Sequence, residues 1–221
     1  MTGLRRQVLF SLIILGIPQG VFAQAGVEIT RKHGTPAEAR TREQLDRLLA
    51  TYDLSAWIYT KRVVVDEQAI PFSHPVLTLH TRHAKDDELL VSTFVHEQLH
   101  WFQVDRQQET DQAIADLRKL FPTVPLGGTT GARDEQSTYL HLLVCYLEQQ
   151  ADRRIFGELK TKEIMDFWAT DHYTWVYKTV IARGREIGDV MSVSSLSLTV
   201  GTSRPLMHLS AMYQRFERQR T

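Results

Sequence analysis

The pentapeptide at residues 96 to 100, His-Glu-Gln-Leu-His, combines residue types that can bind a metal ion and use it. Residues four apart lie on the same face of a helix, so His96 and His100 can direct two imidazole nitrogens at one point. Zinc suits such a pair of ligands. Glu97 directly follows the first histidine, where its carboxylate can reach a metal-bound water without being a ligand. The motif predicts a zinc-dependent hydrolase of amide or peptide bonds, with Glu97 as general base.

The residues around this HExxH motif predict a buried helix. The mainly apolar segment 89–95 precedes the motif, and Trp101 and Phe102 follow it. Asp86, Asp87 and Glu88 place negative charge at the expected start, which the helix dipole favours, and the helix should run to about Asp105. Buried histidines and glutamates need compensating partners. The alternative interpretation is a core helix whose histidines bond to backbone carbonyls.

A catalytic zinc site usually has three protein ligands and one open position. The extended pattern HExxHxxGxxH would place glycine at 103 and histidine at 106, but the chain has Gln103 and Arg106. This branch is therefore excluded. The third ligand must come from another segment.

A second predicted helix, from Asp134 to about Phe156, carries four candidate residues on one face. They are spaced i, i+4, i+7 and i+11: His141, Cys145, Glu148 and Asp152. Glu148 is the predicted third ligand, and Asp152 is expected to accept a hydrogen bond from the outer nitrogen of a zinc-bound histidine. His141 is the second candidate for the ligand and Cys145 the third. The alternative for Glu148 is a solvated carboxylate on an amphipathic helix.

With His96, Glu97, His100, Glu148 and Asp152, the sequence resembles the gluzincin group of zinc metallopeptidases, which combine HExxH with a later ExxxD pattern. The resemblance covers about residues 75 to 155. It implies an α+β, mainly helical zincin-like domain with a small sheet preceding the HExxH helix, and one Zn²⁺ ion. Two features depart from the thermolysin-like branch: Leu147 stands where that branch has asparagine, and the interval between His100 and Glu148 is longer than in compact members.

The resemblance also implies how substrate is held. An edge strand before the motif helix, here Val76 to Thr81, would pair with the substrate backbone. Enzymes of this type need a hydrogen-bond donor for the oxyanion besides the metal. His172, Tyr173 and Tyr177 on a late helix are the candidates, and the alternative for this aromatic stripe is the core. His80 and His83 are expected on the surface or the cleft wall rather than as ligands.

The N-terminus has the layout of a secretory signal peptide. Arg5 and Arg6 precede an apolar run of about ten residues, too short to span a bilayer. We expect cleavage after Ala23 or Ala25, followed by one zinc metallopeptidase-like domain over residues 26–221. The mature protein is expected to be exported, periplasmic or secreted, with no stable membrane anchor. An uncleaved anchor is the alternative.

The composition of the mature chain limits its partners. Loss of Arg5 and Arg6 without any acidic residue changes the formal net charge from 0 to −2. A near-neutral surface argues against nucleic acid, whereas peptide or protein substrates fit. Cys145 is the single cysteine, so the chain forms no internal disulfide, and its apolar neighbours predict a buried, inert thiol.

Further elements can be predicted along the chain. We expect a capped helix from Thr35 to about Tyr52, strands at Trp57 to Val65 and Pro75 to Thr81, a helix from Gln107 to Phe121, a flexible glycine-containing loop from Thr123 to Ala132, a long helix from Thr161 to about Ile187, and short surface elements in the tail with Pro205.

Two other functions fit the same sequence. An amidase that acts on cell-wall peptides would share the zinc chemistry. A catalytically inactive zincin-like binding or scaffold protein would retain the helices without turnover. Metal content measured beside activity separates an enzyme from the scaffold protein.

Overall fold

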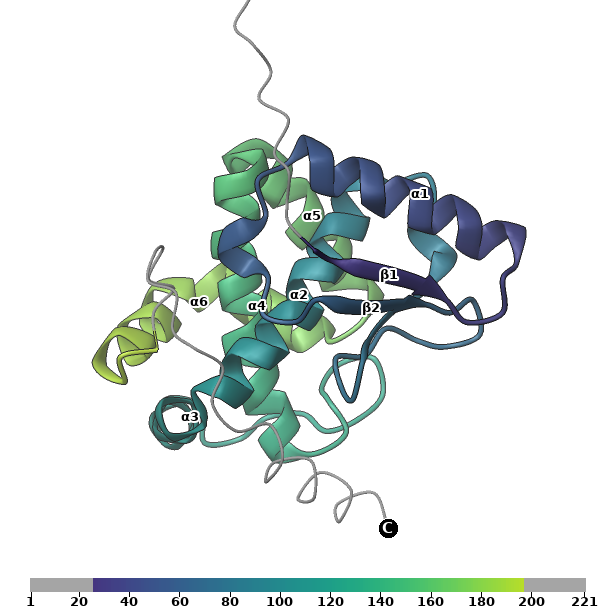
Figure 1. Cartoon of the computed structure of the whole chain (residues 1–221). Helices are drawn as coiled ribbons and strands as arrows, with labels where there is room; N and C mark the ends of the chain where they lie inside the picture. The colour runs from purple at the N-terminus through teal and green to yellow at the C-terminus, as the bar shows by residue number, and fades with distance from the viewer. Residues whose placement is uncertain (1–25, 197–221) are drawn as a thin grey trace, which may run out of the picture.

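The structure is a computed structural model that describes residues 26–196 and has an α+β fold dominated by helices (Figure 1). The expected signal peptide and the tail with Pro205 lie outside the described residues. The helices are α1 (Pro36–Thr51), α2 (Asp87–Asp105), α3 (Gln107–Leu120), α4 (Glu135–Phe156), α5 (Glu158–Asp171) and α6 (Thr174–Val193), and the strands are β1 (Glu28–Arg31), β2 (Arg62–Val65) and β3 (Leu77–Leu79). None of these helices is long and apolar enough to cross a membrane.

The three strands form a parallel sheet in the order β1-β2-β3, which precedes the motif helix as expected. Both predicted strands are shorter than expected. Trp57, the expected start of the first, ends a 3₁₀ turn of residues 55–57. The segment before β2 is held by the Gln98 amide, whose Oε1 accepts from the backbone N–H groups of Tyr59 and Thr60. The sheet is thereby tied to α2.

Helix α2 lies at the centre of the molecule, between the sheet with α1 on one side and α4 on the other (Figure 1). Its first turn is capped by Asp86, whose carboxylate accepts from the N–H of Leu89. Leu90, Val91, Phe94, Val95 and Leu99 are all within the core. The predicted buried helix, with its acidic start and its end at Asp105, is confirmed.

Helix α4 packs against α2, α5 and α6. Asp134 caps its start by accepting from the N–H of Ser137, and Gly157 ends it with a positive φ of 80°. The predicted helix from Asp134 to about Phe156 is confirmed, as is the burial of Cys145.

The prediction of one long helix from Thr161 to about Ile187 was wrong, because the helix is interrupted at His172 and Tyr173, between α5 and α6. Tyr173 adopts a left-handed conformation with φ 47°. The break leaves N–H groups at the start of α6 that need partners. Thr174 and Trp175 donate these to the carbonyl oxygens of Thr129 and Thr130, at 2.8 and 3.1 Å.

The segment expected as a loop, Thr123 to Ala132, is irregular and carries the carbonyls that cap α6. Its own shape is fixed by bonds across the turn: Gly127 N–H donates to the carbonyl of Ala132, and Ala132 N–H donates to the hydroxyl of Thr138 on α4. The loop therefore links the first turns of α4 and α6.

Substitution Gly131→Ala tests this loop, because a Cβ at that position would lie 2.0 Å from the carbonyl oxygen of Pro125. We expect a loss of about 2 kcal/mol or more in the free energy of unfolding, since backbone must shift to relieve the overlap. Gly184→Ala on α6 is the matched control: its nearest contact would be 3.7 Å, so denaturant unfolding should show no loss. Equal stability of the two variants would contradict this account of the loop.

Candidate metal centre

The site forms where α2 and α4 pack side by side in opposite directions. The contact pairs are Ser92 with Asp152, His96 with Glu148, and His100 with His141, so residue numbers rise along α2 while they fall along α4. An α-helix rises 1.5 Å per residue, so one to two turns separate successive contacts. The HExxH residues of α2 thus face the predicted stripe of α4.

Three histidines converge at this interface. One ring nitrogen from each of His96, His100 and His141 lies within 4.8 Å of the other two. The ring centroids are 5.1 Å apart for His96 and His100, 5.7 Å for His96 and His141, and 5.0 Å for His100 and His141. His96 is 6% exposed and His141 9% exposed. Such a cluster of imidazoles is the ligand type that zinc uses in catalytic sites.

Hydrogen bonds set the tautomer of two of these rings. Nδ1 of His141 is 2.6 Å from the carbonyl oxygen of Ser137, and Nδ1 of His96 is 2.9 Å from Oε2 of Glu148. Both partners are acceptors, so Nδ1 carries the proton and Nε2 keeps its lone pair in the neutral ring. A metal-binding histidine is usually held in this way by a carbonyl or a carboxylate.

Glu148 is buried behind His96 and receives hydrogen bonds from two other helices, α2 and α6. Its Oε2 accepts from the hydroxyl of Tyr177 at 2.9 Å as well as from His96, and its Oε1 is 2.6 Å from the hydroxyl of Ser92. Burial disfavours the imidazolium form of His96, but the Glu148 carboxylate outweighs it, and the pKa of His96 is raised well above its usual value. The carboxylate therefore favours positive charge at this point.

Asp152 lies one turn further from the histidines. Its Oδ2 is 3.1 Å from the Ser92 hydroxyl, which also accepts from the indole N–H of Trp168. A hydroxyl has one proton and cannot donate to both Glu148 and Asp152. Burial, together with the charge of Glu148, raises the pKa of Asp152 well above its usual value, so a proton on Asp152 completes the network.

Glu97 lies beside this cluster and is 6% exposed. Desolvation by burial raises the pKa of its carboxyl to about 7; the charge of His96 opposes this shift and that of Glu148 adds to it. A general base works best when its pKa lies near the working pH. His100 and His141 are kept neutral by burial, which lowers the pKa of His100 well below its usual value and that of His141 to about 3.

The break between α5 and α6 forms another wall of the site. The ring of Tyr173 packs on that of His141 with centroids 4.2 Å apart, and its strained conformation is of a kind that clusters at functional sites. His172 lies nearer the surface with a side chain 40% exposed. The Tyr177 hydroxyl is committed to Glu148, which leaves Tyr173 and His172 as the open candidates for contact with a substrate.

The structure places the predicted site residues in two groups, and the third residue beside His96 and His100 is not the expected Glu148. His96, His100 and Glu97 come together with His141, the second candidate. Glu148 forms a ligand group with His96 and Cys145, but none with His100 among the described residues. Glu148 makes the contact to the outer nitrogen of His96 that Asp152 was expected to make. The spacing of the stripe indicated the face but not which residue meets which histidine.

The strand expected to pair with substrate is covered. In β3, the carbonyl of Leu79 faces β2, where it accepts from Asp66, so the backbone groups of Thr78 point to the outer edge. Both are used by Phe72, whose N–H and C=O bond to Thr78 at 3.1 and 2.8 Å. A peptide cannot pair with Thr78 in this arrangement. His83 is buried, whereas His80 is more exposed, and neither belongs to the histidine cluster.

A third group of possible ligands, His33, Glu38 and Asp66, lies near the ends of β1 and β2. Glu38 is fully used within the fold, because its carboxylate accepts from the backbone N–H groups of His33, Gly34 and Glu67. The hydrogen bonds of this group therefore stabilise the loop before α1.

Comparison of the chain with protein-family models, with curated proteins and with solved structures found no match.

Tyr177→Phe tests the support of His96 by removing one of the donors to Glu148. We expect a loss of about 1 kcal/mol in stability and about a tenfold weaker affinity for Zn²⁺, because the His96 partner is less firmly held. Tyr139→Phe is the control, since that buried hydroxyl donates to the carbonyl of Phe121, far along α4 from Glu148. It should lose similar stability in thermal unfolding and keep its zinc affinity in metal titration. Equal zinc affinities would contradict the role of Tyr177.

Proposed function

We propose that this protein is an exported zinc-dependent hydrolase of peptide-type amide bonds. The observation that carries the proposal is the convergence of three histidine nitrogens beside a buried glutamate whose pKa lies near neutrality. His96, His100 and His141 would hold one Zn²⁺ ion, leaving a position for water. Export rests on the N-terminal sequence pattern alone.

The donor set fits zinc on chemical grounds. His141 is neutral, with Nδ1 occupied by the Ser137 carbonyl and the Nε2 lone pair free. His96 has Nδ1 occupied by Glu148 and would release its Nε2 proton on binding the metal. The carboxylate of Glu148 supplies negative charge behind His96, which favours a cation in front of it. When bound, zinc lowers the pKa of a coordinated water to about 7 and polarises a carbonyl group.

Glu97 is assigned as the general base. Its carboxylate takes a proton from the attacking water and later delivers it to the nitrogen of the leaving group. Burial beside the histidines makes both transfers accessible near neutral pH, because the raised pKa lies close to the working pH. The neighbouring Gln98 is engaged with the backbone of residues 59 and 60, which fixes the turn of α2 that carries Glu97.

Tyr173 is assigned as the hydroxyl donor to the developing oxyanion. Its ring is already packed against His141, so its hydroxyl need not be ordered during the reaction. Tyr177 and Ser92 act indirectly: both bond to the carboxylate of Glu148, which holds His96.

Glu97→Gln is the direct test of hydrolysis. The amide cannot accept the proton, so we expect kcat on peptide and murein substrates to fall by a factor of about 100 to 10,000 while one zinc is retained. Glu43→Gln, an exposed change on α1, should leave both unchanged. Zinc retained without turnover in the parent protein would instead support a non-catalytic binding protein, and cleavage of murein peptides alone would support a cell-wall amidase.

The pH profile of kcat/KM provides a second measure of Glu97. Protonation of the base abolishes activity, so the rate should fall as the pH decreases through the pKa of Glu97, which is about 7 without metal. A bound cation favours the carboxylate, so the acidic limb should lie at or below pH 7. A rate unaffected by acidification to pH 4 would argue against a carboxylate base.

The third ligand can be tested by comparing His141→Ala with Glu148→Gln. His141→Ala should lose stoichiometric zinc, whereas Glu148→Gln should keep the metal with an affinity reduced about 10- to 100-fold. Elemental analysis after dialysis against a weak chelator distinguishes the two. The reverse result would identify Glu148 as the ligand, as the sequence pattern alone indicates.

A further inference from the structure

We propose that Arg82 is a positioning residue that fixes the orientation and tautomer of His172 at the rim of the metal centre. The inference rests on the proposed hydrolase function and extends it to a residue outside the motif. It is carried by a chain of contacts between the turn before α2 and the end of α5.

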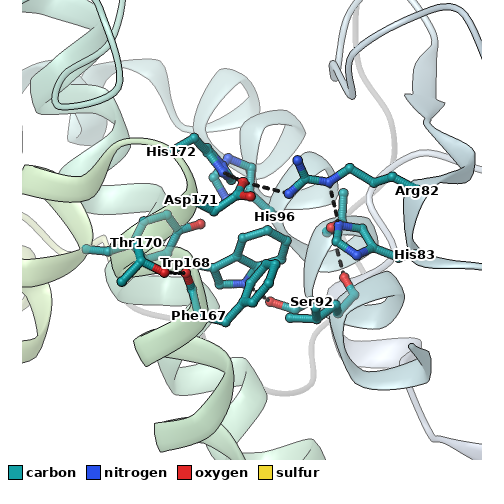
Figure 2. Close-up of polar contacts among 12 residues, drawn as sticks. Arg82, His83, Ser92, His96, Phe167, Trp168, Thr170, Asp171 and His172 are labelled. Atoms are coloured by element: carbon teal, nitrogen blue, oxygen red, sulfur yellow. Dashed lines mark hydrogen bonds and ion pairs between the residues drawn. The ribbon is translucent and has the colours of Figure 1, made fainter. Parts of the chain in front are cut away.

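Arg82 and Asp171 form the first link of this chain (Figure 2). Nη2 of Arg82 is 2.6 Å from Oδ2 of Asp171, although 89 residues separate them in sequence. The same oxygen accepts from Nδ1 of His172 at 2.8 Å. One carboxylate oxygen therefore joins the guanidinium to the imidazole.

The shared oxygen decides the state of His172. An arginine stays charged in proteins, so Asp171 remains an acceptor beside it, and the pKa of Asp171 is lowered despite its partial burial. His172 must then carry its proton on Nδ1, which leaves Nε2 as an acceptor in the neutral ring. Arg82 thus stabilises the charge of Asp171 and holds the oxygen that accepts from His172 in place.

Arg82 is itself held from two other directions. Its Nε donates to Nε2 of His83 at 2.8 Å, and its guanidinium carbon lies 5.6 Å from the ring centre of Trp168. The Trp168 indole N–H donates to the hydroxyl of Ser92 (Figure 2). That hydroxyl contacts Glu148, the hydrogen-bond partner of His96. Arg82 is thus linked to His172 through Asp171. It is also linked to the Ser92 hydroxyl, which contacts Glu148, through Trp168.

His172 lies where it can influence the reaction. Its ring is 4.9 Å from Tyr173 and 5.7 Å from Tyr177, centre to centre, and the Tyr173 ring in turn packs on that of His141. At 40% exposure, its side chain is more accessible than Glu97 or the buried His96. An acceptor fixed at this rim would meet an incoming substrate before the histidines do.

The experiment compares Arg82→Met and Arg82→Lys with Arg47→Met in the full-length mature protein loaded with zinc. Arg47 is the matched control, because it forms a similar surface pair with Asp87, with bonds of 2.7 and 3.0 Å, on the far side of α2. Expected for both Arg82 variants are a fall in kcat of about tenfold, unchanged zinc content and a shifted pH profile. Arg47→Met should keep the kcat and pH profile of the parent.

A double variant separates positioning from a general structural effect. If Arg82 acts through His172, then Arg82→Met should not lower kcat further in the His172→Ala background. A further fall of the same size in that background would overturn the proposal.

The tautomer of His172 provides a readout that does not require activity. Nitrogen-15 NMR of the imidazole should show the Nδ1–H form in the parent protein and a mixture of both forms in Arg82→Met. The same tautomer in both proteins would overturn the inference about Arg82. A tautomer change in a protein that hydrolyses no peptide would reject the hydrolase proposal and leave the contact chain supported.

Discussion

The buried carboxylate of Glu148 is the interaction on which the arrangement of the site depends. A carboxylate taken out of water costs several kcal/mol unless hydrogen bonds and charges compensate it. Its partners come from two other helices: Ser92 and His96 from α2 and Tyr177 from α6. Because each partner must stay within bonding distance, this one group fixes how α2, α4 and α6 sit against one another. The orientation of the first histidine of the motif follows from it.

Much of the helical framework could be predicted because its signals are local. The acidic start of α2, the capping residue Asp134 and the single face of His141, Cys145, Glu148 and Asp152 all follow from helix geometry and capping chemistry. Local signals do not decide whether His141 or Glu148 lies opposite His100. This choice depends on the direction and the axial offset of α4 relative to α2, and α3 with a long loop intervenes between them, so the sequence spacing fixes neither.

Non-local backbone bonding explains the other differences. Nothing in the residues around His172 and Tyr173 is a helix breaker, yet the helix ends there because carbonyls of a loop more than forty residues earlier in the chain receive the N–H groups of α6. Likewise, Val76 to Thr81 has the composition of an edge strand, but Phe72 folds back and uses its outward backbone groups. Propensity describes a segment in isolation, whereas these outcomes depend on which partner reaches it.

The position of Cys145 has a consequence for how the protein can be studied. Its thiol is sealed between α4 and its neighbours near His96, and burial raises its pKa, so the reactive thiolate is scarce in the folded chain. An alkylating reagent can reach it only when the packing of α2 or α6 against α4 opens. Because the chain has no second cysteine, the rate of that single labelling reaction measures how often the packing around the histidine-bearing helix α4 opens spontaneously.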